Sequence, residues 1–146
     1  MTGVGPDDCR RLREGGSYED EAGYSRAVRR GRLIVVSGTT CSPDVVDLGT
    51  YAQTVDCLQH VVAAVEHLGG SRSGIFRTRL FLTPGADWRA ASRAHREILG
   101  TVAPANTTLF VHGLIGDGLL VEVEANALAD ADWPARTPEM DVNPDA

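Results

Sequence analysis

The sequence has few basic residues and no long hydrophobic run. Its 146 residues include 14 Lys+Arg against 20 Asp+Glu, which gives a formal net charge of −6 at pH 7. Nucleic acid is a polyanion, so this balance argues against binding through a broad basic surface. The longest apolar stretches, such as 33–36, are far too short to cross a bilayer. We therefore expect neither nucleic acid nor a membrane among the partners.

Paired cysteines and metal-ligand clusters are also missing. Cys9, Cys41 and Cys57 form no Cys-x-x-Cys pair and no even framework, which predicts free, reduced thiols. Acidic residues and glycine precede any apolar stretch, so we expect no secretory signal and a cytoplasmic protein. His60 and His67 share a helix face, but no third ligand joins them. We expect no metal.

The composition predicts one globular domain between two flexible ends. Hydrophobic residues make up 42% of the chain, which is ordinary for a protein with a packed core. Residues 1–22 show almost no apolar periodicity, and they are predicted to be a flexible leader. Residues 131–146 combine prolines with acidic residues and form a predicted tail, in which Trp133 could lie against the surface. The compact domain is expected over 23–130.

Two helices are predicted within this domain. The first begins at Thr50, where Thr50 and Gln53 match a capping box, and it ends before a glycine pair. Apolar residues at helical spacing follow the proposed cap. The second helix opens with Asp87 as its N-cap and continues to Leu99, after which Gly100 stops it.

Alternating or β-branched runs predict strands at 24–28, 33–37, 75–83, 107–111 and 121–127. The segment 115–118 resembles a hairpin turn joining the last two strands. The order of elements predicts an α+β fold with both helices on one face of a mixed sheet. Two helices leave the other face uncovered, and an apolar uncovered face favours self-association.

Several short motifs carry a resemblance to a known family. They are Tyr-Ser-Arg-Ala-Val at 24–28, Val-Ser-Gly at 36–38, Pro-Ala at 104–105 and Val-Glu-Val-Glu-Ala at 121–125. In this order they resemble the Rid (YjgF-type, reactive intermediate deaminase) family over roughly residues 23–128. The resemblance implies a chorismate-mutase-like α+β fold. It also implies a homotrimer whose sheets line a central barrel, with a cleft between each pair of subunits.

The resemblance also implies a chemistry. Such clefts hydrolyse 2-imino or enamine intermediates to keto acids and ammonia, with no metal or organic cofactor. Carried over to this chain, Tyr24 would line the cleft, Gly38 would offer backbone groups to the substrate, and Glu122 would position or activate the attacking water. A carboxylate can accept the water's proton when burial raises its pKa.

The chain departs from the family pattern at Asn106. An arginine that grips the substrate carboxylate is the family's residue at this position. Asparagine donates hydrogen bonds without a charge, so roughly 1.5–3 kcal/mol of charged hydrogen bonding would be absent. Thr107 and Thr108 could add a neutral hydrogen-bonding wall, although β-branched residues also simply fit a strand. We count Asn106 and Thr108 as substrate-binding, and we expect a small-molecule substrate less dependent on a carboxylate.

Other interpretations stay open. Arg26, Arg77 and Arg79 could replace the missing charge, or they could be solvated or pair with the Glu122 and Glu124 face of a neighbouring strand. His112 could approach the cleft, whereas His95 is assigned to a surface or an interface. The main hypothesis is an imine or enamine hydrolase, which could serve a specialised biosynthetic pathway. The alternative is a non-catalytic trimer that binds a metabolite or acts as a scaffold.

Overall fold

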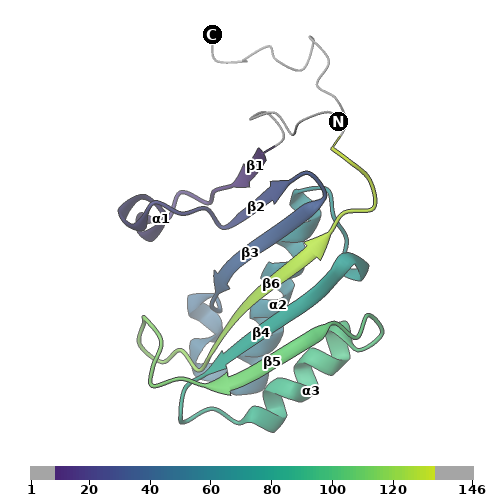
Figure 1. Ribbon diagram of the computed structural model, residues 1–146. Coiled ribbons are helices and arrows are strands. Elements are labelled where there is room, and N and C mark those ends of the chain that lie inside the picture. The colour runs from purple at the N-terminus through teal and green to yellow at the C-terminus, as the bar shows by residue number, and fades with distance from the viewer. Residues whose placement is uncertain (1–8, 134–146) are drawn as a thin grey trace.

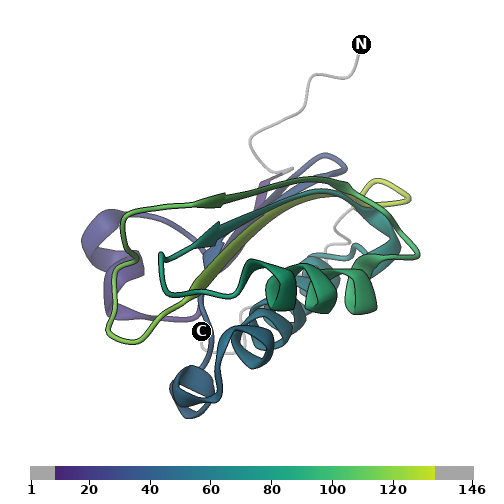
Figure 2. The same ribbon diagram turned by 90° about the horizontal axis from the view of Figure 1, so that it is seen from below.

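The computed structural model describes residues 9–133 of the chain. Within them, one layer of strands is covered by two long helices (Figures 1 and 2). The strands are β1 (Cys9–Leu12), β2 (Ala27–Arg30), β3 (Leu33–Thr39), β4 (Ile75–Leu82), β5 (Ala105–Phe110) and β6 (Val121–Leu128). The α-helices are α1 (Ser17–Ala22), α2 (Thr50–His67) and α3 (Trp88–Leu99), and two 3₁₀ helices span Pro43–Leu48 and Arg72–Gly74.

The strands form a single mixed sheet in the order β1-β2-β3-β6-β4-β5. All neighbouring pairs are antiparallel except β4 and β5. Those two are parallel because α3 carries the chain back to the starting end of the sheet before β5 begins. Both α2 and α3 lie on the same face of the sheet, as Figure 2 shows from below. The predicted α+β fold with two helices on one face is therefore confirmed.

The core lies between this face and the two helices. Residues of α2 at helical spacing are fully buried, among them Leu58, Val61 and Val65. Along β6, Val121 and Val123 are buried while the residues between them face away from the helices. Burying each such aliphatic side chain stabilises the fold by about 1.5–3 kcal/mol. The predicted two-residue period of this strand thus sets which side chains face the helices.

The opposite face of the sheet carries a mixture of apolar and charged side chains. Leu33 pairs with Leu128 across β3 and β6, and both are exposed. Arg79 Nη1 lies 3.0 Å from Glu124 Oε1, and Arg77 donates to the hydroxyl of Thr107. The expected pairing with the acidic face of a neighbouring strand therefore holds for Arg79, whereas Arg77 contacts a threonine instead.

The predicted capping box at the start of α2 is wrong. Gly49 precedes the helix, and the Thr50 hydroxyl accepts from the backbone N–H of Asp87. Gln53 is fully buried; its amide donates to the carbonyls of Val46 and Gly118 and accepts from another loop N–H. In a capping box the Gln side chain reaches back to the backbone N–H of the N-cap residue, whereas here it bonds buried loop groups that need hydrogen-bond partners.

The N-cap predicted for α3 is confirmed, because the Asp87 carboxylate accepts from the N–H groups of Arg89 and Ala90. The hairpin predicted at 115–118 is wrong, because β4 lies between β5 and β6. Turn-forming residues also occur in long connections between strands that do not pair. The sequence alone could therefore not distinguish a hairpin from such a connection.

Part of the segment predicted to be a flexible leader has regular secondary structure. Residues 9–12 form β1, which pairs with β2, and residues 17–22 form α1, which ends where Gly23 adopts a left-handed backbone conformation. Because α1 and its turn occupy the preceding residues, β2 begins at Ala27 rather than at Tyr24. Residues 1–8 and 134–146 lie outside the described residues, and with them most of the predicted tail.

The start of the tail is held against the sheet. The guanidinium of Arg29 lies 5.0 Å from the centroid of the Trp133 ring, and that of Arg10 lies 5.6 Å from it. Cation–π contacts of this kind hold Trp133 on the surface, as expected. Within residues 9–133, none of the helices is long and apolar enough to span a membrane.

Candidate functional site

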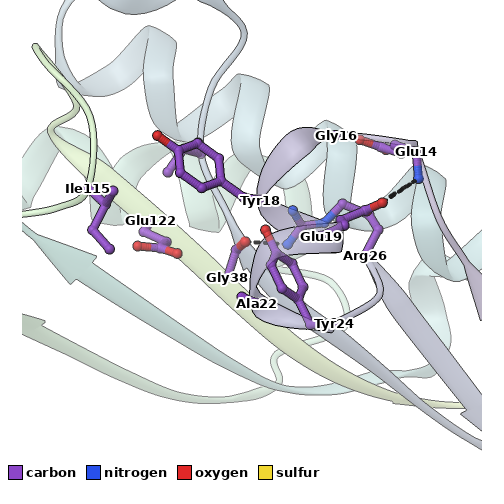
Figure 3. Close-up of a pocket in the computed structure, with 11 residues that line it drawn as sticks. Glu14, Gly16, Tyr18, Glu19, Ala22, Tyr24, Arg26, Gly38, Ile115 and Glu122 are labelled. Atoms are coloured by element: carbon purple, nitrogen blue, oxygen red, sulfur yellow. Dashed lines mark hydrogen bonds between the residues drawn. The ribbon is translucent and has the colours of Figure 1, made fainter.

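Three of the five predicted site residues line one cavity of about 420 Å³. Tyr24 comes from the chain before β2, Gly38 from the end of β3, and Glu122 from the start of β6. Figure 3 shows Glu122 beside Gly38, with Ile115 on the far side of the carboxylate. Of the described residues, those that line it are Glu14, Gly16, Tyr18, Glu19, Ala22, Tyr24, Arg26, Gly38, Thr40, Ile115 and Glu122.

Gly38 has no side chain, and this leaves the space that the Glu122 carboxylate occupies. A Cβ atom on Gly38 would lie 2.1 Å from Glu122 Oε1 and 2.9 Å from its Cδ. The β3–β6 register shifts between Val36 and Thr39, so Gly38 sits in an irregular stretch beside the first residues of β6. A glycine at a bulge often marks the close approach of another group. Here that group is the Glu122 carboxylate.

The environment of Glu122 favours its neutral form. Burial raises the pKa of this carboxyl above its ordinary value; the positive charge of Arg26 acts to lower the pKa, and nearby Glu124 acts to raise it. Desolvation disfavours the charged form of any carboxyl, so a half-buried glutamate holds its proton to higher pH than an exposed one. A carboxyl with a raised pKa in a cavity is suited to giving and taking protons.

Arg26 is the cation of this cavity. Its Nη2 donates to the carbonyl of Gly38, and its guanidinium lies 6.0 Å from the centroid of the Tyr24 ring. The Nε atom is buried, and among the described residues it has no hydrogen-bond partner. Sequence reasoning left Arg26 open as a substitute for the missing arginine; the structure places it beside Glu122.

The ordered leader forms one wall of the cavity, which sequence reasoning missed. Glu19, only 4% exposed, accepts hydrogen bonds from the backbone N–H groups of Glu14 and Gly15. These bonds fold the chain before α1 so that Tyr18 reaches the cavity (Figure 3). A single short helix with few apolar residues leaves no periodic signal that could have identified this wall.

Asn106 and Thr108 line a different cavity, also of about 420 Å³, at the edge of the sheet. Its walls are Leu82, Trp88, Ser92, Leu109 and Phe110. The Asn106 amide donates to the Thr78 hydroxyl at 3.0 Å and accepts from the Thr108 hydroxyl at 2.9 Å. Thr78 is fully buried and contacts His95 of α3, so Asn106 faces the helices.

Glu122 and Asn106 therefore lie on opposite faces of the sheet. Glu122 alternates with Val121 and Val123, which face the helices, and β4 separates its strand from β5. One chain does not bring the predicted catalytic and substrate-binding residues together. Tyr24, Gly38 and Glu122 form one group, and Asn106 and Thr108 form the other.

A small polar cluster adjoins the first cavity. His60 Nε2 lies 3.1 Å from Asp56 Oδ2 and 2.9 Å from the Ser42 hydroxyl. Both partners meet the same ring nitrogen, unlike a catalytic triad, in which acid and nucleophile use different nitrogens. Burial raises the pKa of the neighbouring Cys41 thiol, and Asp56 raises it further, as befits an unreactive cysteine.

The remaining histidine considered for the cleft lies outside these cavities. His112 is in the loop after β5, and it lines neither the Glu122 cavity nor the Asn106 cavity. Among residues 9–133, no group of three or more His, Cys, Asp or Glu side chains could hold a metal ion.

Comparison with known proteins places the chain in a family. Residues 17–129 match the family described as endoribonuclease L-PSP, and the chain belongs to that family. An uncharacterized protein of Streptomyces coelicolor is 34% identical over 125 residues, which covers 84% of this chain and 93% of the relative.

Solved structures agree with this assignment. A Mycobacterium tuberculosis protein of the YjgF/YER057c/UK114 family is 38% identical with a TM-score of 0.76, covering 83% of this chain and 99% of its own. A Pseudomonas aeruginosa protein of unknown function is 31% identical with a TM-score of 0.74, covering 88% and 98%. The resemblance seen in the sequence motifs is confirmed, and it extends into α1, beyond the predicted domain boundary.

Proposed function

We propose that the protein hydrolyses an imine or enamine at sites shared between neighbouring subunits of a homotrimer. The observation that carries this proposal is the half-buried Glu122 carboxyl. It lies against Gly38 in a cavity, beside Arg26, and its pKa is raised. Family membership supports the fold and the proposed assembly, and the Glu122 carboxyl can accept and return the proton that hydrolysis requires.

The reaction needs only a held water and a proton carrier. Ionised Glu122 accepts a proton from water as the oxygen attacks the imine carbon. Glu122 returns that proton to the nitrogen, which gives the carbinolamine. The nitrogen gains its second proton from the carbinolamine hydroxyl as the C–N bond breaks, which releases ammonia and leaves a carbonyl. The sum is R₂C=NH + H₂O → R₂C=O + NH₃, and Glu122 ends in its starting state. General acid–base catalysis by one such group contributes roughly 10²–10⁴-fold.

A shared site follows from where the two groups of residues lie. Trp88 is 45% exposed and Phe110 53% exposed at the Asn106 cavity, and Ile115 is 86% exposed at the Glu122 cavity. Exposed apolar residues around two concave regions favour an interface. In a closed ring, the Asn106 edge of one subunit would meet the Glu122 cavity of the next. Each active site would then take Tyr24, Gly38 and Glu122 from one chain and Asn106 and Thr108 from its neighbour.

The charges of the cavity favour a substrate that carries little negative charge. Among residues 9–133, Glu14, Glu19 and Glu122 line it with a single cation, Arg26. The field of these groups stabilises a protonated imine, which is the form that water attacks most readily, and it repels a phosphodiester chain. The acidic balance of the whole chain argues in the same direction, so we do not propose ribonuclease activity.

The direct test is ammonia release from imines generated in situ, by an amino-acid oxidase or a dehydratase for those with an α-carboxylate and by an amine oxidase for those without one. Imines with and without an α-carboxylate should be compared, since the proposal favours the second group. Wild type should accelerate hydrolysis over the spontaneous rate, and Glu122→Gln should lose about 100-fold or more of that acceleration. Equal rates for wild type and Glu122→Gln on every imine would remove the hydrolase proposal.

A non-catalytic metabolite-binding or scaffolding trimer is the second candidate. The neutral Asn106 amide favours it, because the family's charged carboxylate anchor is absent at this position. A binder would gain thermal stability from its ligand by mass action without consuming it. Thermal-shift screening of wild type and Asn106→Arg, with ammonia measured in the same samples, separates the two functions.

A further inference from the structure

Four side chains form a continuous hydrogen-bonded chain from α3 to the edge of the sheet. Thr108 donates to Asn106 Oδ1 at 2.9 Å, and Asn106 Nδ2 donates to Thr78 Oγ1 at 3.0 Å. Thr78 Oγ1 in turn lies 2.8 Å from His95 Nε2. These hydrogen bonds therefore connect the half-buried His95 to the Asn106 amide, which we place in the substrate site.

The direction of the last bond follows from counting donors and acceptors. Thr78 is fully buried, and its hydroxyl has one proton. If the oxygen accepted from both Asn106 and His95, that proton would be left unpaired inside the protein, which is costly. With the Asn106 amide in this orientation, the Thr78 proton therefore points to His95 Nε2. His95 is then neutral, with its own proton on Nδ1.

From this geometry we infer that His95 and Thr78 are positioning residues that fix which way the Asn106 amide faces in the site. The inference rests on the proposed function only in placing Asn106 against substrate. With the chain in this direction, one N–H and one oxygen lone pair of Asn106 remain for a ligand, each at a defined place. A substrate with a complementary acceptor and donor is selected without a charged anchor.

Protonation of His95 would reverse the donor–acceptor direction of these hydrogen bonds. Both ring nitrogens of a charged histidine are donors, so Nε2 would donate to Thr78 Oγ1 and the Thr78 proton would turn to Asn106. The amide would have to flip to offer its oxygen. Burial lowers the pKa of His95, so the neutral chain is the state present at neutral pH. Binding should therefore weaken only as the pH falls below the ordinary range of histidine.

Charged groups around α3 do not take part in this change. Among the described residues, burial alone lowers the pKa of His95. Where α3 packs on α2, Tyr51, Arg93 and Glu97 contact one another. On β4, Arg77 and Arg79 bind partners on the other face of the sheet.

The first test needs no substrate. Long-range ¹H–¹⁵N spectra of the full-length protein at neutral pH report which ring nitrogen of His95 carries the proton. The expected result is a proton on Nδ1 in wild type and in Thr78→Ser, and a mixture of tautomers in Thr78→Val. A proton on Nε2 in wild type would overturn the inferred direction. This result stands even if no imine is hydrolysed, so its failure is separate from that of the proposed function.

The second test measures coupling to Asn106. Thr78→Val has nearly the same shape as wild type and lacks the hydroxyl; it should raise KM about fivefold and change kcat less, as expected for one lost hydrogen bond. Thr78→Ser should restore KM. In an Asn106→Ala background, Thr78→Val should change nothing further. An equal loss in both backgrounds would mean that Thr78 supports only the fold, and would overturn the proposal.

His95→Gln gives a control for pH. Its side-chain oxygen can accept from Thr78 at any pH and cannot become charged. The KM of wild type should rise on acidification while that of His95→Gln stays flat. The same acid dependence in both proteins would overturn the role of His95.

Discussion

The carboxylate of Glu122 occupies the space where a side chain on residue 38 would stand. A Cβ on Gly38 would come within 2.1 Å of Glu122 Oε1, much closer than atoms in van der Waals contact. Two strands that pair antiparallel, β3 and β6, therefore bring together a glycine and a glutamate that are far apart in sequence. The glycine fixes the place of the proposed proton carrier.

Gly38→Ala should leave the fold intact and remove most of the activity. The atoms that a methyl group would meet belong to the flexible end of Glu122, so the carboxylate can move aside. A displacement of about 1 Å from the reacting atoms can cost about 10²-fold in rate. The measurement is imine hydrolysis beside a thermal melt. Gly85→Ala, where a methyl group meets nothing within 4 Å, is the matched control and should keep full activity. Wild-type activity in Gly38→Ala would show that the carboxylate position is unimportant.

Glu122→Gln should stabilise the protein at neutral pH while it removes activity. Burial raises the folded-state pKa of Glu122, so the folded state binds more protons than the unfolded state between the unfolded and folded pKa values. Stability contributed by this group is full below the unfolded pKa and falls as pH rises toward the folded pKa. The neutral glutamine avoids that loss. Melting temperatures measured from acid to neutral pH should show a gain for the variant that disappears in acid. A variant less stable than wild type at neutral pH would contradict this account.

Arg26 should set the acid side of the pH–rate profile. Its positive charge acts to lower the pKa of Glu122, so Arg26→Met should raise that pKa further. Since the ionised form acts as the base, kcat/KM would then begin to fall at a higher pH than in wild type. Arg26→Lys keeps the charge and should leave the profile near that of wild type. An unchanged profile in Arg26→Met would mean that another group controls the acid limb.

Arg29 should be among the most sensitive residues for stability. It is 2% exposed, and its guanidinium donates to the carbonyls of Gly31, Leu68 and Ala131. Arg29→Lys keeps a charge but cannot reach three separated carbonyls as the guanidinium fork does, so roughly 2–3 kcal/mol of unfolding free energy should be lost. Denaturant unfolding measures the loss. Arg30→Lys, at the exposed neighbouring position, should change little.

The sequence predicted the elements whose buried residues recur at a regular spacing along the chain. Two-residue alternation located β6, and a helical stripe with an acidic N-cap located α3. The family resemblance of the short motifs selected Tyr24, Gly38 and Glu122, which share one cavity. Contacts between distant segments have no such period. The local pattern therefore predicts Gln53 as a cap, although it serves two loops, and gives no sign that His95 contacts Thr78.

The separation of Asn106 from Glu122 could not be predicted from their order in the chain. It follows from β4 entering the sheet between β5 and β6, which is a property of topology. Because β4 separates them, Asn106 and Glu122 can contact the same substrate only if they come from two different subunits.

Mixing two impaired variants tests that claim most directly. Glu122→Gln and Asn106→Ala subunits would be unfolded and refolded together in equal amounts, and the mixed trimers assayed for imine hydrolysis. If each site takes Glu122 from one chain and Asn106 from its neighbour, about a quarter of the sites regain both native residues, and activity should rise to about a quarter of wild type. Activity no higher than the average of the two separate variants would show that the residues do not meet across subunits.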